Sequence, residues 1–322
     1  MEKIVFNPSE KPTVGIEVEA QLVDNSSGDL VNIAEGIIKQ YSNEDRVKHE
    51  LYLSTVEITS SPLMNTNDTY KELSSIFKKV LEIAKKEKAI AIHDEIRKYL
   101  PLFLALSASS PFWRGKDTEL YCARLSVFQG LPNTGLPEPY YEWSQYEQSL
   151  QTLVKAGVIK PDVGYRQVWK DVRIHPEYGT VETRIADSMP SLVETVAVAT
   201  LIQALVIKIG RDWEDGVLNE PDPNWLIERN RWAAIKEGLN AKFITGTDGN
   251  TEPIVDVIKN LASELSDIGE ELGSINRLNF VNNILESTPL VETMRNIHKE
   301  SSLVELVKEL QKKLFNSLSE DN

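Results

Sequence analysis

The chain has 322 residues, of which 41% are hydrophobic and 26% charged, a composition typical of a soluble globular protein with ample material for a core. Its formal net charge of −14 argues against general binding to nucleic acid or anionic membranes, so an anionic substrate would need a site locally inverted by arginines or metal ions. The single cysteine, Cys122, excludes an intrachain disulfide and fits a reducing cytoplasm.

The first predicted strand covers residues 14–22, where apolar and polar residues alternate and Glu17 and Glu19 share the polar face. The segment MEKIVFNPSEKP before it lacks the apolar core of a signal peptide, which agrees with a cytoplasmic location. The NSSGD stretch at residues 25–29 predicts a turn that closes a hairpin.

A second strand is predicted over residues 49–59, but its alternation changes phase in the middle. A bulge near residues 54–55 would reset the pleat and bring Glu50 and Glu57 to the same side. Helices are predicted from Asn67 or Asp68 to about residue 86 and from 89 to about 106. The Gly- and Pro-rich stretch 107–140 predicts a loop-rich segment, either a lid or pocket wall or a rigid packed loop, and a helix follows over residues 143–156.

Two further strands are predicted at residues 168–175 and 180–187, joined by a turn at 176–179. In the second of them, Glu182 and Arg184 stand on the polar face, while Val181 and Ile185 face a core. Helices follow over residues 192–214, 224–239, 253–265 and 303–318; the first is apolar, but its charged residues favour a buried core helix over a membrane span. We therefore expect one α+β domain over residues 1–322, in which the strand-rich residues 1–190 carry the site and residues 191–322 are helical.

Carboxylates gather on the polar faces of three predicted strands. Five of them on one side of a sheet would repel one another unless cations lay between them, and Mg²⁺ prefers carboxylate oxygens and substrate phosphates. Arg184, with Arg173, could hold a phosphate that such cations neutralise, which is the arrangement phosphoryl transfer needs. The alternative is a surface ion pair between Glu182 and Arg184.

The chain has no P-loop, Rossmann fingerprint, Gly-x-Ser-x-Gly or His-Glu-x-x-His motif. Cys122 is a better candidate for a packed residue than for a nucleophile.

At these residues the chain resembles the glutamate–cysteine ligase-like carboxylate–amine ligases, which are related to glutamine synthetase. The matching stretches run in order along most of the chain: VGIEVE at 14–19, VEIT at 56–59, LALSASSPFW at 104–113, GKDT at 115–118, LPNTGLP at 131–137, DVR at 171–173, TVETR at 180–184, NRW at 230–232 and GLNA at 238–241. Each stretch alone is a weak signal, and their joint order is specific.

The resemblance implies a curved antiparallel sheet with helices on one side, and an ATP- and Mg²⁺-dependent ligase active on small molecules. It would phosphorylate the side-chain carboxylate of glutamate and couple it to an amine, L-cysteine in the best-known members, as in glutathione biosynthesis. The residues that the resemblance assigns as Mg²⁺ ligands are Glu17, Glu19, Glu50, Glu57 and Glu182. Arg184 would contact the γ-phosphate, and Arg173 and Arg124 would contact substrate or phosphate. Relatives alone suggest a homodimer.

One departure from the family pattern affects this expectation. Family members carry a strand with His-x-His-x-Gly between the two helices predicted at 67–86 and 89–106, whereas this chain passes directly from Glu87 to Lys88. Either the strand has been lost together with a metal-binding histidine, or the sequence omits a mobile segment; we favour the second because both flanks retain family character. Near Arg124 the pattern is also diluted, since Glu119 replaces a usual glycine.

Three functions follow, in decreasing order of support. The first is the ligase, for cysteine or for a different amine. The second is a catalytically impaired ligase-like scaffold that binds nucleotide or glutamate, which the absent histidine strand favours. The third is a structural α+β protein whose surface carboxylates have no function.

Overall fold

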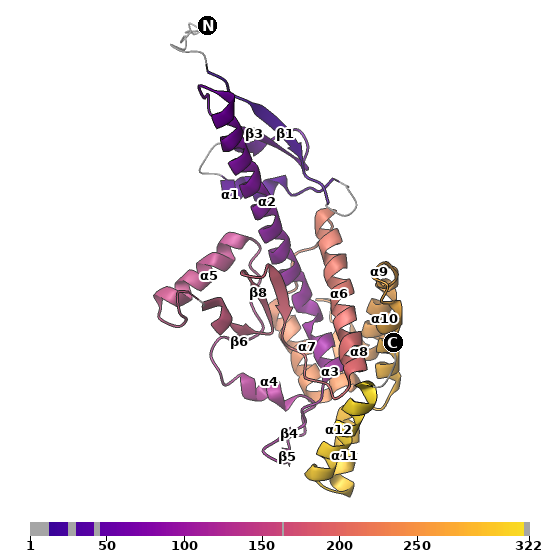
Figure 1. Cartoon of the computed structure of the whole chain (residues 1–322). Coiled ribbons are helices and arrows are strands. Elements are labelled where there is room, and N and C mark those ends of the chain that lie inside the picture. Colours follow the sequence, from indigo (N-terminus) through magenta and orange to yellow (C-terminus); the bar gives the residue numbers. More distant parts are fainter. Residues whose placement is uncertain (1–12, 25–29, 42–45, 163, 319–322) are drawn as a thin grey trace.

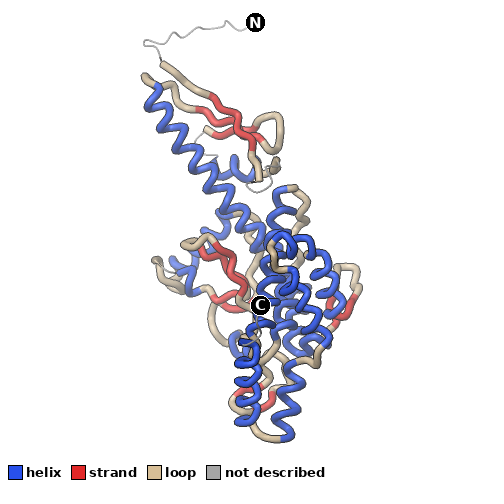
Figure 2. The backbone as a smooth tube through the Cα atoms, turned by 45° about the vertical axis from the view of Figure 1, so that its right-hand side comes forward, coloured by secondary structure: helices blue, strands red, loops and turns tan. Residues whose placement is uncertain are grey.

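A 31-residue helix, α2 (Thr66–Ile96), connects the N-terminal sheet to the rest of the molecule (Figure 1). The computed structural model describes residues 13–24, 30–41, 46–162 and 164–318. The predicted turn at 25–29 and the segment MEKIVFNPSEKP lie outside these residues. The predicted mixture of helices and strands is confirmed (Figure 2).

The helix α2 overturns the prediction of two helices separated near residue 87. Asn65 caps it by accepting a hydrogen bond from the Asp68 backbone N–H at 2.9 Å, two residues before the predicted start. Residues 84–92 are alanine, lysine, glutamate and isoleucine, which favour helix and contain no breaker. The helix therefore continues through the Glu87–Lys88 junction, and it ends at η1 (Arg97–Tyr99), just before Pro101.

The N-terminal region is a three-stranded antiparallel sheet in the order β1-β3-β2, packed on α1 (Ala34–Tyr41) and the first half of α2. Its strands are β1 (Glu17–Gln21), β2 (Val47–His49) and β3 (Thr55–Thr59). The prediction of one bulged strand at 49–59 is wrong, because β2 and β3 form a hairpin. Leu51, Tyr52 and Leu53 lie in its exposed turn, so the phase change in the sequence marks a chain reversal.

The central region carries short strands and loops beside the second half of α2. The hairpin β8 (Val172–His175) with β9 (Thr180–Thr183) packs through Ile174 and Val181 on α2 and α5 (Trp143–Lys155). The remaining elements of this region are α3 (Leu100–Ser107), β4 (Phe112–Trp113), β5 (Lys116–Asp117), α4 (Ala123–Phe128), β6 (Thr134–Gly135), η2 (Gly164–Gln167) and β7 (Trp169–Lys170). The predicted strand at 168–175 is interrupted at Asp171, between β7 and β8.

The C-terminal region is mainly helical, as predicted. It comprises α6 (Leu192–Glu214), α7 (Asn224–Glu237), η3 (Gly238–Asn240), β10 (Lys242–Ile244), β11 (Thr251–Pro253), α8 (Ile254–Glu264), α9 (Ser266–Glu271), α10 (Ile275–Glu286), α11 (Leu290–Glu300) and α12 (Leu303–Leu318). The β10–β11 hairpin and three of the helices, α9 to α11, were not predicted. By length and composition α6 could cross a membrane, and within the described residues it is the one helix that could. Its apolar side packs in the main core with α3, α7 and α10, as expected for a core helix.

The predicted single curved sheet is not confirmed. The described strands form one three-stranded sheet and separate two-stranded pairs, and β6 pairs with β7 in parallel. In both views the N-terminal sheet lies at one end of α2, and the β8–β9 hairpin lies beside the other half of that helix (Figures 1 and 2).

Candidate functional site

The β8–β9 hairpin forms the centre of the candidate site. Its register places Arg173 directly opposite Glu182, as expected for residues that share the polar face. Both Nε and Nη2 of Arg173 donate to Glu182 Oε2, at 3.1 and 2.5 Å, and Arg184 Nη1 donates to Glu182 Oε1 at 3.0 Å. One carboxylate is therefore held between two guanidinium groups, and the predicted proximity of Glu182 and Arg184 is confirmed.

The environment of Arg173 differs from that of Arg184. Arg173 is buried, and its Nη1 donates to the carbonyls of Tyr165, Arg166 and Val168 at 3.2–3.4 Å. All three nitrogens of its guanidinium group are engaged inside the protein, which indicates a positioning role for Arg173 beneath Glu182. A direct contact of Arg173 with substrate or phosphate stays a prediction.

The side chain of Arg184 lines a cavity of about 60 Å³ between α4, β6, β7 and α7. Four cationic side chains line this cavity, which we call the cationic cavity: Arg124, Lys170, Arg184 and Arg231. The cavity is a locally positive region in a chain of net charge −14. An anionic substrate would need such a region in so acidic a protein.

Each arginine of the cationic cavity is held by one carboxylate. Arg184 pairs with Glu182, and Arg231 pairs with Asp171 through Nε at 2.6 Å, in a buried position. Arg124 pairs with Asp187 through Nε at 2.6 Å. Because a guanidinium group held on one edge keeps a fixed orientation, its remaining donors are preorganised.

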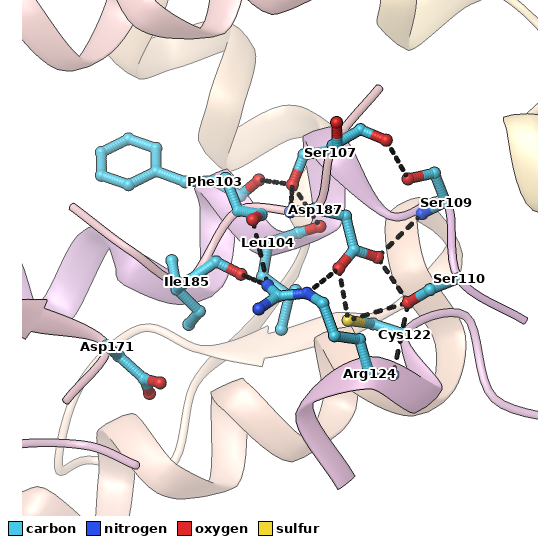
Figure 3. Close-up of polar contacts among 12 residues, drawn as sticks. Phe103, Leu104, Ser107, Ser109, Ser110, Cys122, Arg124, Asp171, Ile185 and Asp187 are labelled. Carbon is cyan, nitrogen blue, oxygen red and sulfur yellow. Dashed lines mark hydrogen bonds and ion pairs between the residues drawn. The ribbon is translucent and has the colours of Figure 1, made fainter. Parts of the chain in front are cut away.

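Asp187 accepts hydrogen bonds from several groups around it (Figure 3). The Ser109 backbone N–H and the Ser110 hydroxyl donate to its Oδ2 at 3.0 and 2.7 Å, and the Cys122 thiol donates to its Oδ1 at 3.2 Å. Burial, with the nearby charge of Asp187, raises the pKa of Cys122 to about 12. A thiol that stays protonated at neutral pH is a poor nucleophile, so the packed role predicted for Cys122 agrees with the structure.

The orientation of Arg124 follows from this cluster. Its Nη2 donates to the carbonyls of Ile185 and Ala186 at 2.6 and 3.0 Å, in addition to the Nε bond to Asp187 (Figure 3). Arg124 therefore links α4 to the chain that follows β9 and lines the cationic cavity from that side. Whether it also contacts substrate stays a prediction.

The sequence motifs assigned no role to four residues of the cavity and the neighbouring cluster: Asp171, Lys170, Asp187 and Arg231. Asp171 and Arg231 lie in the stretches DVR and NRW, which resemble the family. This resemblance is the sequence feature that could have identified both residues as part of the site. Strand parity places Asp171 on the face of Arg173, whereas the break between β7 and β8 allows it to pair with Arg231 instead.

The other predicted metal ligands lie on the N-terminal sheet or beside it. Glu19 and Glu57 are directly opposite each other across β1 and β3, with Glu17 two residues along the same face, and Glu50 follows β2. Lys48 faces Glu57 from the other side. Within the described residues of the chain, no group of three or more His, Cys, Asp or Glu side chains could hold a metal ion. The structure therefore brings Glu19 to Glu57, but their strands β1 and β3 lie away from β8, whose partner strand β9 carries Glu182 (Figure 1).

Comparisons with known proteins agree with these motifs. The model of the family described as "Glutamate-cysteine ligase family 2" matches residues 13–87 and 81–309. The chain is 30% identical to "Putative glutamate--cysteine ligase 2-1" of Frankia casuarinae over 346 residues, covering 88% of this chain and 90% of the relative. It is also 30% identical to "Putative glutamate--cysteine ligase 2" of Thermobifida fusca over 374 residues, covering 96% and 93%.

Among solved structures, a bifunctional glutathione synthetase from Pasteurella multocida matches with a TM-score of 0.49 and 13% identity. The match covers 94% of this chain but 51% of that one, so the present chain spans about half of that protein. The two segments matched by the family model overlap at residues 81–87, inside α2 and next to the Glu87–Lys88 junction.

Proposed function

Because this chain belongs to glutamate–cysteine ligase family 2, we propose that it is an ATP-dependent ligase that phosphorylates the side-chain carboxylate of glutamate and joins it to an amine. L-Cysteine is the first candidate for the amine, which would give γ-glutamylcysteine for glutathione biosynthesis. The family match and the relatives over most of the chain support a ligase of the glutamate–cysteine ligase type.

The cationic cavity beside the Arg173–Glu182–Arg184 network is the observation that carries the proposal. Transfer of a phosphoryl group develops negative charge on its oxygens, and fixed cationic donors stabilise that charge. In this assignment Arg184 contacts the transferred phosphoryl group, Glu182 orients Arg184, and Arg173 positions Glu182. The acyl phosphate formed in this way is then attacked by the amine, which releases phosphate.

ATP and Mg²⁺ are the cofactors of the proposed reaction. Mg²⁺ would neutralise phosphate charge, and Glu19 with Glu57 would supply two carboxylate ligands of the type that a hard cation prefers. Like charges directly opposite each other on a sheet repel, and a cation between Glu19 and Glu57 would relieve that repulsion. We assign Glu19 and Glu57 to the metal on this ground, and Glu17, Glu50 and Glu182 on the resemblance alone.

The remaining features of the proposal concern the protein as a whole. We propose a single ligase domain over residues 1–322, in the cytoplasm, with small molecules as substrates and without nucleic-acid or membrane partners. The homodimer suggested by relatives belongs to the same proposal. The acidic net charge supports the exclusion of nucleic acid, because phosphate backbones are bound by basic surfaces.

The proposed function predicts that ADP is released from Mg-ATP when L-glutamate and an amine are both present. Dependence on glutamate and cysteine together would establish the glutamate–cysteine reaction, and a preference for another amine would keep the ligase and change its product. A scaffold without turnover is the second candidate, favoured by the separation of the N-terminal carboxylates from Glu182. A melting temperature raised by Mg-ATP, with no ADP release over a broad amine panel, would select the scaffold.

The metal assignment predicts that Glu19→Gln and Glu57→Gln each raise the Mg²⁺ concentration needed for half-maximal ADP release by at least about tenfold. The reason is that each change removes an anionic oxygen donor from the pair across β1 and β3. Glu252→Gln, at an exposed position on β11, is the matched control. An unchanged Mg²⁺ dependence in both sheet variants would remove these residues from the metal site.

A further inference from the structure

We propose that the cationic cavity is a preformed site for a tetrahedral oxyanion, and that Lys170 and Arg231 are its binding residues together with Arg124 and Arg184. The identity of the anion as the transferred phosphoryl group rests on the proposed function, whereas the site itself rests on the geometry of the cavity. Neither Lys170 nor Arg231 was assigned a role by the sequence motifs.

The charge around the cavity favours an anion. The three arginines are paired with Glu182, Asp187 and Asp171, but each carboxylate lies on one edge of its guanidinium group. Lys170 adds a fourth positive charge, and its Nζ donates to neutral carbonyl oxygens. The cavity therefore holds one more cationic group than the carboxylates that brace it. An anion would relieve the repulsion among these like charges.

Unused donors remain on these side chains. Within the residues that the structure describes, the hydrogen bonds leave Nη1 of Arg124, Nε and Nη2 of Arg184 and Nη1 of Arg231 without a protein acceptor. Lys170 Nζ donates to the carbonyls of Thr134 and Leu136 at 2.9 and 3.4 Å, so one of its three N–H groups remains. Guanidinium and ammonium groups with fixed orientations and spare donors are suited to phosphate.

The size and the arrangement of the cavity favour a phosphoryl group over larger ligands. Its volume is about 60 Å³, and since roughly 10–15 Å³ of such volume holds one water molecule, the cavity has room for a small anion. The four cationic groups come from different elements: α4, β7, the chain after β9, and α7. Donors that approach from several directions match a tetrahedral anion, whereas a planar carboxylate is best held by one bidentate guanidinium.

Binding of inorganic phosphate to the full chain, measured by titration calorimetry without nucleotide or Mg²⁺ at low ionic strength, tests this proposal. We expect saturable 1:1 binding, competition by sulfate, and no competition by acetate or glutarate at matched ionic strength. Lys170→Met should weaken phosphate binding about tenfold, because it removes a charge-assisted donor and keeps the apolar stem. Lys170→Arg should retain binding, and Lys160→Met, at an exposed lysine outside the cavity lining, is the matched control.

Circular dichroism and the melting temperature establish that the variants are folded. Absence of phosphate binding to the wild-type chain, or equal binding by Lys170→Met, would overturn the oxyanion site. Equal competition by acetate or glutarate would make it a carboxylate site and overturn the phosphoryl assignment. The proposed function can fail separately from the oxyanion site. If phosphate binding depends on Lys170 but no amine supports ADP release, the ligase function is contradicted and the oxyanion site is retained.

Discussion

Replacing Arg184 by methionine should reduce ADP release by at least about a hundredfold while the protein stays folded. Removing one fixed donor from a developing oxyanion typically costs a factor of about 10²–10³ in rate. The structural cost is small, because the only ion pair of Arg184 among the described residues is with Glu182, which is partly exposed to solvent. Exposed pairs of this kind contribute about 0–1 kcal/mol to the free energy of unfolding.

The measurement is the initial rate of ADP release with Mg-ATP, L-glutamate and the preferred amine, together with the melting temperature. Arg166→Met is the matched control, because Arg166 also forms an ion pair with an exposed glutamate, Glu177, outside the cationic cavity. Glu182→Gln should likewise reduce the rate, since it releases Arg184 from its fixed position. Full activity in the Arg184 variant would show that the site is assigned to the wrong region of the molecule.

Replacing Arg231 by methionine should lower the free energy of unfolding by about 3–5 kcal/mol, since it leaves the buried carboxylate of Asp171 without its partner. Both side chains of this pair are almost completely buried, and Arg231 Nε lies 2.6 Å from Asp171 Oδ2. Asp171 is further connected, because its backbone N–H donates to the Gly135 carbonyl and its carbonyl accepts from the Arg184 N–H. Loss of the pair should therefore disturb the cationic cavity as well as stability.

Urea unfolding at fixed pH measures this change. The double variant Asp171→Leu with Arg231→Met should recover most of the lost stability, because removing both partners leaves no uncompensated buried charge. It should not recover ADP release, since Arg231 also lines the cationic cavity. A single variant that loses less than about 1 kcal/mol would mean that water reaches Asp171, and the pair would then not be a structural support of the site.

The sequence by itself determined the elements whose pattern is local. Alternation along single strands placed Glu17 with Glu19, and Glu182 with Arg184, and the structure agrees on both pairs. The helices at Leu192–Glu214 and Leu303–Leu318 were predicted to the residue, since their apolar spacing is continuous. The ordered motifs also identified the family. Each of these inferences about helices and strands depends on neighbours within a few residues, where the pleat or the helical turn fixes which side chains share a face.

Only the tertiary structure decided which distant residues meet. Asp171 and Arg231 are separated by 60 positions, and their pairing depends on how α7 packs beside the hairpin. Lys170 lines the cavity because β7 pairs with β6. The continuity of α2 likewise places the N-terminal carboxylates away from Glu182, which strand parity could not reveal. The physical reason is that periodicity reports the face of an element, whereas contacts between elements follow from packing of the whole core.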